Sequence, residues 1–190
     1  MQNWMKLVAA AAAMVAAGAA FAQKTELTVY TALEIDQLKA YEAAFNKANP
    51  DVAIKWVRDS TGVITAKLLA EKSNPKADVV MGVAASSLAI FDKNDMLQGY
   101  APKGLEAVTA KYRDSKNPPH WVGMDVFGAT ICFNTVEAKK RNIPTPTSWQ
   151  DLTKPEFKGQ VVMPNPASSG TGYFDVAAWL QLFGDDNGKG

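Results

Sequence analysis

The sequence has one histidine and one cysteine among its 190 residues, and neither sign of charge predominates. A single cysteine excludes an internal disulfide, and a single histidine excludes a histidine-rich metal cluster. With 20 basic and 19 acidic side chains the formal net charge is +1, and no run of like charge occurs. A nucleic-acid-binding surface and a charged tail are therefore not expected. The remaining composition, 47% hydrophobic and 21% charged, is that of a globular protein.

The longest apolar run lies at the N-terminus. Leu7 to Ala20 is almost wholly apolar, follows the positive charge of Lys6, and leads into the small-x-small triplet Ala20-Phe-Ala22. This order is typical of a secretory signal peptide, and the run is too short and too rich in alanine for a membrane-spanning helix, which needs roughly 20 residues. We therefore predict a signal peptide over residues 1–22, cleaved after Ala22, and a mature protein in a bacterial periplasm.

The first part of the mature sequence alternates between strand-like and helical patterns. Strands are predicted at Leu27–Tyr30, Val52–Val57 and Asp78–Gly82, and helices at Ile35–Lys47 and Val63–Lys72. The helices show apolar residues at three- and four-residue steps, which places one apolar face on a sheet. This alternation predicts parallel βαβ units with right-handed crossovers.

The pattern after residue 120 predicts a second α/β unit that is incomplete. Trp121 to Phe133 is one long strand-like stretch, in which Cys132 is expected to be buried. Gln160 to Met163 predicts a further strand, and Tyr173 to Leu180 a helix. One strand and one helix are too little to close a core, so we interpret the sequence as lacking the C-terminal half of this second unit.

Two polar loops each join a predicted strand to a predicted helix, and both are rich in hydroxyl groups and glycine. Their residues are Ser60, Thr61 and Gly62 in the first loop and Ser168, Ser169, Gly170 and Thr171 in the second. Hydroxyls and backbone N–H groups at a helix start direct partial positive charge at an anion. Loops at the carboxyl ends of strands in open α/β sheets face the ligand crevice. Ordinary helix N-capping is the alternative interpretation of each loop.

Several short motifs run in order through the mature chain. They are Tyr30-Thr-Ala-Leu-Glu34, Asp59-Ser-Thr-Gly62, Asn74-Pro-Lys-Ala-Asp-Val79, Trp121-Val-Gly123, Pro146-Thr-Ser-Trp149 and Pro164-Asn-Pro-Ala-Ser-Ser-Gly-Thr-Gly172. With these motifs the chain resembles the extracellular solute-binding proteins of ABC importers, in the branch that includes ferric-iron binders. Within that branch it is most similar to binders of 2-aminoethylphosphonate.

The resemblance implies a two-lobed α/β periplasmic-binding-protein fold, type II-like, with the ligand in the cleft between the lobes. Such proteins are roughly twice as long as this sequence. On that pattern residues 23–120 form lobe 1, residues 121–134 an inter-lobe crossing strand, and residues 135–190 the incomplete start of lobe 2. The two hydroxyl-rich loops would then close on one anion from opposite lobes.

The resemblance also bears on the charge of the ligand. Ferric members have a histidine ligand where this chain has Glu34, and an acidic ligand where this chain has Val83 or Ala84. Valine and alanine cannot bind a metal, so no metal is expected in the cleft. The Glu34 carboxylate could instead pair with a ligand ammonium, or it could be a solvated acid that suits the first turn of a helix. Further candidates for the binding site are Thr31, Asp125 and Tyr173, with Asp175 as another acid for the amine.

Together these features predict the periplasmic substrate-binding component of an ABC importer. It would capture a small phosphonate, 2-aminoethylphosphonate, and deliver it to an inner-membrane permease, as a monomer when full length and without a cofactor. The alternative in the same class is a ferric-iron or other small-anion binder. A secreted hydrolase would need an activated nucleophile, a base and an orienting group. Because Ser168 and Ser169 lie in no nucleophile-elbow motif and His120 is expected at the surface, the protein is not expected to be an enzyme.

Overall fold

The computed structural model describes residues 24–184, so the predicted signal peptide lies outside the described residues. By its internal contacts the described chain divides into two compact units. The first consists of residues 24–27 with Ile35–Lys55, and the second of Thr28–Glu34 with residues 56–184. No helix among residues 24–184 is both long enough and apolar enough to cross a membrane.

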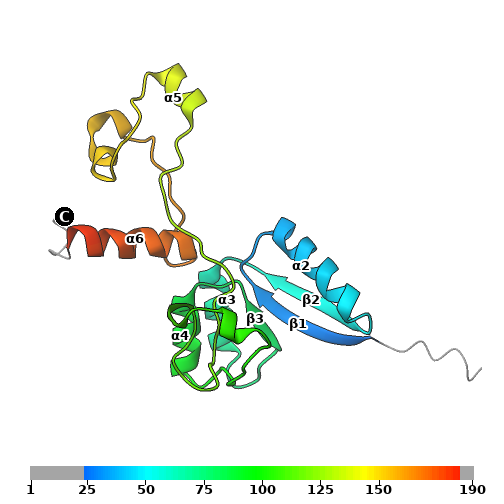
Figure 1. Ribbon diagram of the computed structural model, residues 1–190. Coiled ribbons are helices and arrows are strands. Elements are labelled where there is room, and N and C mark those ends of the chain that lie inside the picture. Colours follow the sequence, from blue (N-terminus) through cyan, green and yellow to red (C-terminus); the bar gives the residue numbers. More distant parts are fainter. Residues whose placement is uncertain (1–23, 185–190) are drawn as a thin grey trace, which may run out of the picture. The chain divides into compact units, whose positions relative to one another are not determined.

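A three-stranded sheet forms at the start of the chain. Its strands are β1 (Thr25–Thr31), β2 (Val52–Arg58) and β3 (Val79–Met81), in the order β2-β1-β3 (Figure 1). β1 and β3 pair in parallel, with Val29, Tyr30 and Thr31 opposite Val79, Val80 and Met81. Non-consecutive strands that lie side by side in parallel require a crossover connection, so the predicted mixed α/β fold with parallel strands is confirmed for β1 and β3, and the right-handedness of the crossover stays a prediction.

The first unit holds helix α2 (Ile35–Ala48) together with one end of the sheet. Leu38 is the buried residue of α2, and the helix carries Asp36 in its first turn and Lys47 in its last, as the helix dipole favours. The Thr25 N–H donates to the Asp51 carbonyl at 2.9 Å. The strand, helix and strand predicted over residues 27–57 are all present as β1, α2 and β2, because apolar residues recur at helical spacing in the predicted helix.

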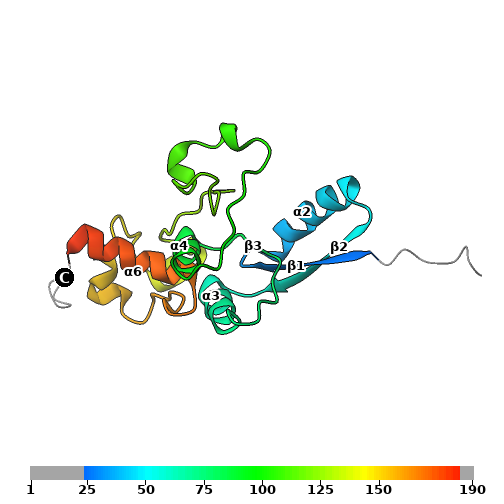
Figure 2. The same cartoon turned by 90° about the horizontal axis from the view of Figure 1, so that it is seen from below.

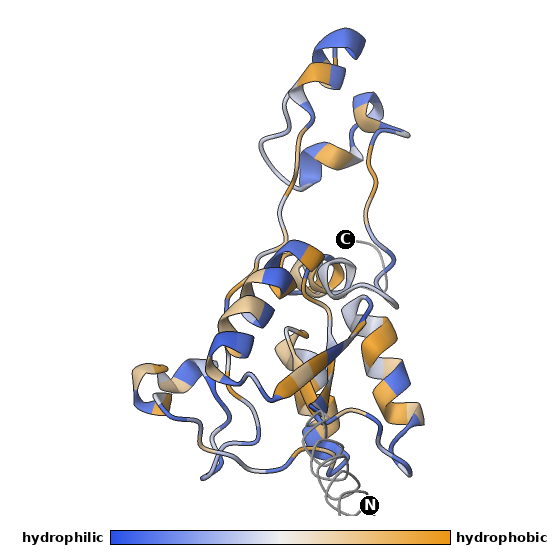
Figure 3. Cartoon of the chain, turned by 90° about the vertical axis from the view of Figure 1, so that its right-hand side faces the viewer, coloured by the Kyte–Doolittle hydropathy of each residue, from blue (hydrophilic) through white to orange (hydrophobic). Residues whose placement is uncertain are grey.

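The second unit is built on a small apolar core. The buried residues Tyr30, Ile64, Leu68 and Phe91 pack together, and helices α3 (Thr61–Ala70) and α4 (Ala85–Lys93) lie against each other (Figure 2). The helices of the chain carry both polar and apolar residues, as surface helices do (Figure 3). Helix α4 was not predicted, because it is short and carries in its first turn two serines, Ser86 and Ser87, which favour caps and turns over helix interiors.

The rest of the second unit contains little regular structure apart from two helices. These are α5 (Thr135–Arg141), which was not predicted, and α6 (Gly170–Phe183), which begins three residues earlier than expected. Short 3-10 turns occur at Leu105–Ala107, Ala110–Tyr112, Gln150–Thr153 and Pro155–Phe157.

Two predicted strands in this part of the chain are wrong. Residues 121–133 contribute only an isolated bridge between Val122 and Arg113, and residues 160–163 form no strand. A strand requires a hydrogen-bonded neighbour, and among residues 24–184 none covers Val162, whose side chain is 94% exposed. Cys132, expected to be buried in the first of these stretches, is exposed for the same reason. The boundaries of the two lobes stay a prediction.

The turn that leads into the 3-10 element Gln150–Thr153 is closed by reciprocal hydrogen bonds. The Asp151 carboxylate accepts from the N–H and hydroxyl of Thr147, at 2.7 and 2.9 Å, and from the Ser148 N–H at 3.1 Å. The Ser148 hydroxyl accepts from the Asp151 N–H at 3.2 Å, so Ser148 and Asp151 bond to each other in both directions, as in a capping box. A bond from Lys154 and the bonds from Thr147 hold the pKa of Asp151 far below its usual value.

Phe91→Ala tests the core. Phe91 is 1% exposed, and truncation of a buried phenylalanine lowers the free energy of unfolding by about 3–5 kcal/mol. Ile90→Ala is the matched control, because Ile90 lies on the same helix and is 43% exposed. Urea denaturation of both variants measures the difference, and equal losses would contradict this description of the core.

Asp151→Asn tests the turn. The Asp151 pKa is depressed in the folded protein, so its stabilising effect is present above the ordinary pKa of an aspartate and is lost as pH falls through the folded value. The variant should therefore lower the melting temperature by a few degrees at neutral pH, and the difference from wild type should shrink steadily on acidification. A difference that does not depend on pH would contradict the assignment.

Candidate functional site

The two hydroxyl-rich loops contact each other directly. Ser60 precedes α3 as its N-cap residue but makes no side-chain cap bond. Its hydroxyl instead donates to the carbonyl oxygen of Ser168 at 2.7 Å, and the Gly62 N–H donates to the same oxygen at 3.0 Å. Simple capping therefore does not account for Ser60, whose hydroxyl and neighbouring amide converge on one acceptor.

Glycine makes this close approach possible. A Cβ at Gly62 would lie 2.6 Å from the carbonyl oxygen of Ala167 and 2.7 Å from the Cα of Ser168. A Cβ at Gly170 would lie 2.9 Å from the Thr61 hydroxyl oxygen. The first clash is with backbone, which cannot turn aside as a side chain can, so a residue larger than glycine at position 62 would push the loops apart.

The second loop is shaped by its own hydrogen bonds. The Asn165 carbonyl accepts from the backbone N–H groups of Ser168 and Ser169, at 3.1 and 2.8 Å, and the Asn165 side chain accepts from the Ala167 N–H at 2.8 Å. Ser169 is the N-cap of α6, and its hydroxyl accepts from the Gly172 N–H at 3.3 Å. For Ser169, unlike Ser60, the capping interpretation is confirmed.

The turn between β1 and α2 is hydrogen-bonded to the first loop. The Thr31 carbonyl accepts from the Asp59 N–H at 3.2 Å, and the Thr31 hydroxyl, which is fully buried, accepts from the Leu33 N–H at 3.1 Å. Arg58 donates from Nε to the Leu33 carbonyl at 2.7 Å and from its terminal nitrogen to the Glu34 carboxylate at 2.5 Å. Thr31 and Glu34 are thus held beside the loop that carries Ser60, and Glu34 is paired with a cation of the chain.

A cavity of about 360 Å³ lies beside the contact between the loops. Its polar lining residues are Thr61, Thr65, Ser86, Ser87, Ser169 and Tyr173. The Thr65 hydroxyl lies 2.8 Å from the hydroxyl oxygen of the buried Ser87, which links α3 to the start of α4. The Tyr173 ring is 51% exposed and packs edge-on against Phe174. Apolar residues, among them Leu69, Ile90 and Pro166, make up the rest of the lining, so residues of both hydroxyl-rich loops line one small cavity that is mainly apolar with several hydroxyl groups.

Other predicted site residues lie elsewhere. Thr171 and Asp175 line a different cavity, of about 470 Å³, together with the Trp149–Trp179 pair, whose rings meet edge-on at 5.6 Å. Asp125 lies in an exposed stretch and is among the lining residues of neither cavity. The structure therefore does not bring these residues together with Ser60 and Ser168.

Tyr30 flanks the motifs in sequence but belongs to the core. It is 2% exposed, and its hydroxyl donates to Glu71 at 2.9 Å. Burial, with a smaller effect of Glu71, raises the pKa of Tyr30, whereas the bond from Lys67 lowers the pKa of Glu71. The Tyr30 hydroxyl is therefore committed to this internal network.

Sequence reasoning missed Arg58, Thr65, Ser86 and Ser87. Arg58 directly precedes the Asp59-Ser-Thr-Gly62 motif, and its charge at the end of a strand was a usable signal. Ser86 and Ser87 follow β3 as Ser60 and Thr61 follow β2. The strand-to-helix rule that identified the first loop would have found them, had it been applied to the third strand.

Comparison with known sequences places the chain among binding proteins. A family model for bacterial extracellular solute-binding proteins matches residues 74–189. An uncharacterized protein of Haemophilus influenzae is 32% identical over 180 residues, covering 92% of this chain and 51% of the relative. A probable ABC transporter periplasmic-binding protein of Sinorhizobium fredii is 31% identical over 190 residues, covering 99% and 51%. The chain thus spans about half the length of the curated relatives it matches.

Solved structures of periplasmic binding proteins share the fold. The binding protein AfuA from Actinobacillus pleuropneumoniae, with fructose-6-phosphate bound, is similar with a TM-score of 0.72 and 28% identity, over 86% of this chain and 52% of AfuA. Iron-bound HitA from Pseudomonas aeruginosa has a TM-score of 0.63 and 20% identity, over 85% and 51%, which indicates the fold alone. The family match and the shared mixed α/β fold lead to one conclusion: the chain belongs to the bacterial extracellular solute-binding protein family.

Proposed function

We propose that this chain is part of the periplasmic substrate-binding component of an ABC importer, and that it captures a small amino-phosphonate such as 2-aminoethylphosphonate. The ligand would then be handed to an inner-membrane permease. The observation that carries this proposal is the convergence of the Ser60 hydroxyl and the Gly62 N–H on the carbonyl oxygen of Ser168.

The Ser168 carbonyl shows which acceptor these donors fit. It accepts at 2.7 and 3.0 Å, which are ordinary hydrogen-bond lengths for a neutral carbonyl. A phosphonate oxygen carries more negative charge than a carbonyl, and hydrogen bonds to a charged acceptor are about twice as strong. When the loops separate slightly, a phosphonate oxygen can therefore take the place of the carbonyl, and the loops then close around it.

Arg58 and Glu34 supply the charges that a zwitterion needs. In the structure they neutralise each other, with side chains 34% and 75% exposed. A guanidinium has five N–H donors, and two suffice for the bonds to Glu34 and Leu33. The remaining donors can bind a phosphonate oxygen, while the Glu34 carboxylate accepts from the ligand ammonium. A zwitterionic ligand would thus replace the Arg58–Glu34 ion pair by two ion pairs with the protein, one between Arg58 and the phosphonate and one between Glu34 and the ammonium group.

The cavity beside the loops suits a ligand of this size. Its volume of about 360 Å³ lies at the small end of the range for small-molecule sites. The hydroxyls that line it can accept or donate, so a phosphonate does not require several basic residues there. A ring such as that of Tyr173 can also attract an ammonium group, by about 0.5–2 kcal/mol.

The relatives support the binding role and add two candidate ligands. The Sinorhizobium relative is named as a periplasmic-binding protein of an ABC transporter, and AfuA holds an organic phosphate, fructose-6-phosphate. A sugar phosphate is therefore the second candidate ligand for this chain, because it presents the same tetrahedral oxygens without an ammonium. Ferric iron, which HitA holds, is the third.

Calorimetric titration of the chain with 2-aminoethylphosphonate, fructose-6-phosphate, inorganic phosphate and Fe(III) tests the proposal. We expect 2-aminoethylphosphonate to bind most tightly. Glu34→Gln should weaken it by about 10–100-fold, the effect of one charged hydrogen bond, and should not weaken the two phosphates. Glu106→Gln, an exposed acid on another turn, is the control. Tighter binding of the sugar phosphate, or of iron, would replace the proposed ligand.

Gly62→Ala tests the role of the loop contact. Because the new methyl group would meet the backbone of Ala167 and Ser168, it should hold the loops apart and reduce the affinity for every phosphate-type ligand by about tenfold or more. Gly128→Ala is the matched control, since a Cβ at Gly128 meets nothing within 4 Å. Unchanged affinity in Gly62→Ala would show that ligand does not bind between these loops.

A further inference from the structure

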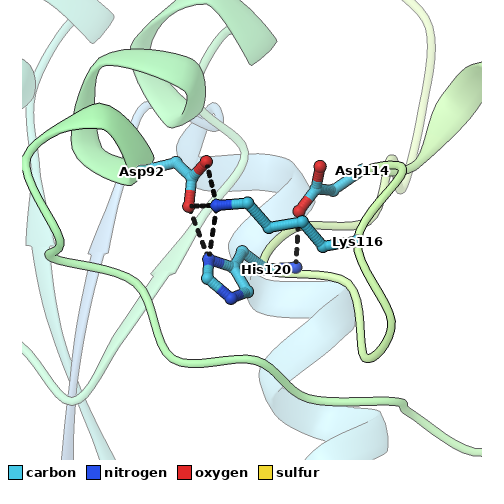
Figure 4. A network of polar contacts seen from close by, with 4 residues as sticks. All are labelled: Asp92, Asp114, Lys116 and His120. Carbon is cyan, nitrogen blue, oxygen red and sulfur yellow. Dashed lines mark hydrogen bonds and ion pairs between the residues drawn. The ribbon is translucent and has the colours of Figure 1, made fainter.

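A second polar cluster lies outside the proposed ligand site, at the end of α4. It contains Asp92 from that helix and Asp114, Lys116 and His120 from the irregular segment that follows (Figure 4). Asp92 and His120 are partly buried, with side chains 20% and 28% exposed. The proposed function makes no use of this cluster.

Three members of the cluster present atoms that could bind one metal ion. A carboxylate oxygen of Asp92, one of Asp114 and a ring nitrogen of His120 all lie within 4.8 Å of one another. His120 Nδ1 lies 2.5 Å from Asp92 Oδ1, and the Asp114 carboxylate accepts from the His120 backbone N–H at 3.0 Å, which fixes the histidine beside it. Carboxylate and imidazole together suit Zn²⁺ and similar divalent ions.

A cation already lies among these ligands. The Lys116 ammonium donates to both carboxylate oxygens of Asp92, at 2.8 and 2.7 Å, and lies 3.3 Å from His120 Nδ1. The Lys116 side chain is 47% exposed, so it can swing into solvent and leave its place to another cation.

We propose that Asp92, Asp114 and His120 form a binding site for a divalent transition-metal cation, for which the Lys116 ammonium is the built-in competitor. The metal would bind the Nδ1 lone pair of neutral His120, whose proton then lies on Nε2, with water completing the coordination. Zn²⁺ would displace Lys116 and join α4 to the segment that leads into Trp121. This site is independent of the proposed ligand site.

Zinc titration followed by proton NMR tests the proposal. His120 is the sole histidine in the sequence, so in a chain without a histidine tag the imidazole signals report this site directly. We expect Zn²⁺ to shift these signals and Mg²⁺ to leave them unchanged, since Mg²⁺ prefers oxygen ligands. Asp114→Asn should weaken zinc binding, measured by competition with a chromogenic chelator, by about tenfold.

Lys116→Met provides the decisive comparison. It keeps most of the aliphatic stem and removes the competing charge, so it should tighten zinc binding by about tenfold or more. Lys103→Met, at an exposed lysine on another turn, should change nothing. A purely structural role of the Lys116–Asp92 ion pair predicts instead that Lys116→Met only lowers the melting temperature. Zinc binding that is absent from both wild type and Lys116→Met, or that survives His120→Gln unchanged, would overturn the proposal.

Discussion

The contact between the two hydroxyl-rich loops is the interaction on which the account of this protein depends. A side-chain hydroxyl and a backbone amide from one loop donate to one carbonyl oxygen of the other. Both donors lie at the start of α3, where the helix dipole adds partial positive charge. Such an arrangement prefers an acceptor with more negative charge than a peptide carbonyl. A small cavity lies beside this contact, and Arg58, which pairs with Glu34, directly precedes the loop that carries Ser60.

The sequence predicted the fold best where one element packs on its neighbour along the chain. The periods of α2 and α3 and the strand between them were readable, because their apolar residues recur at regular steps. Residues 160–163 have an equally strand-like composition, yet Val162 is 94% exposed. Whether such a run becomes a strand depends on a hydrogen-bonded partner, which local pattern does not reveal.

The site was predictable in its parts and not in its pairing. Hydroxyls and glycines before a helix identified Ser60 and Ser168 as candidates, but the bond between them joins residues 108 positions apart. No local rule indicates that the Ser60 hydroxyl turns to a distant carbonyl while Ser169 caps its own helix. Similarly, the exposed acid Glu34 gave no sign that its partner would be Arg58. The membership in the solute-binding family rests on the match of residues 74–189, and the lobe boundaries within it remain predictions.

The most direct test of the central claim follows the backbone amide of Gly62 by ¹⁵N NMR during titration with 2-aminoethylphosphonate. If a phosphonate oxygen replaces the Ser168 carbonyl as the acceptor, the Gly62 amide proton should move downfield, as expected for a stronger bond to a charged oxygen. Saturable binding that shifts other amides and leaves the Gly62 signal in place would contradict the account.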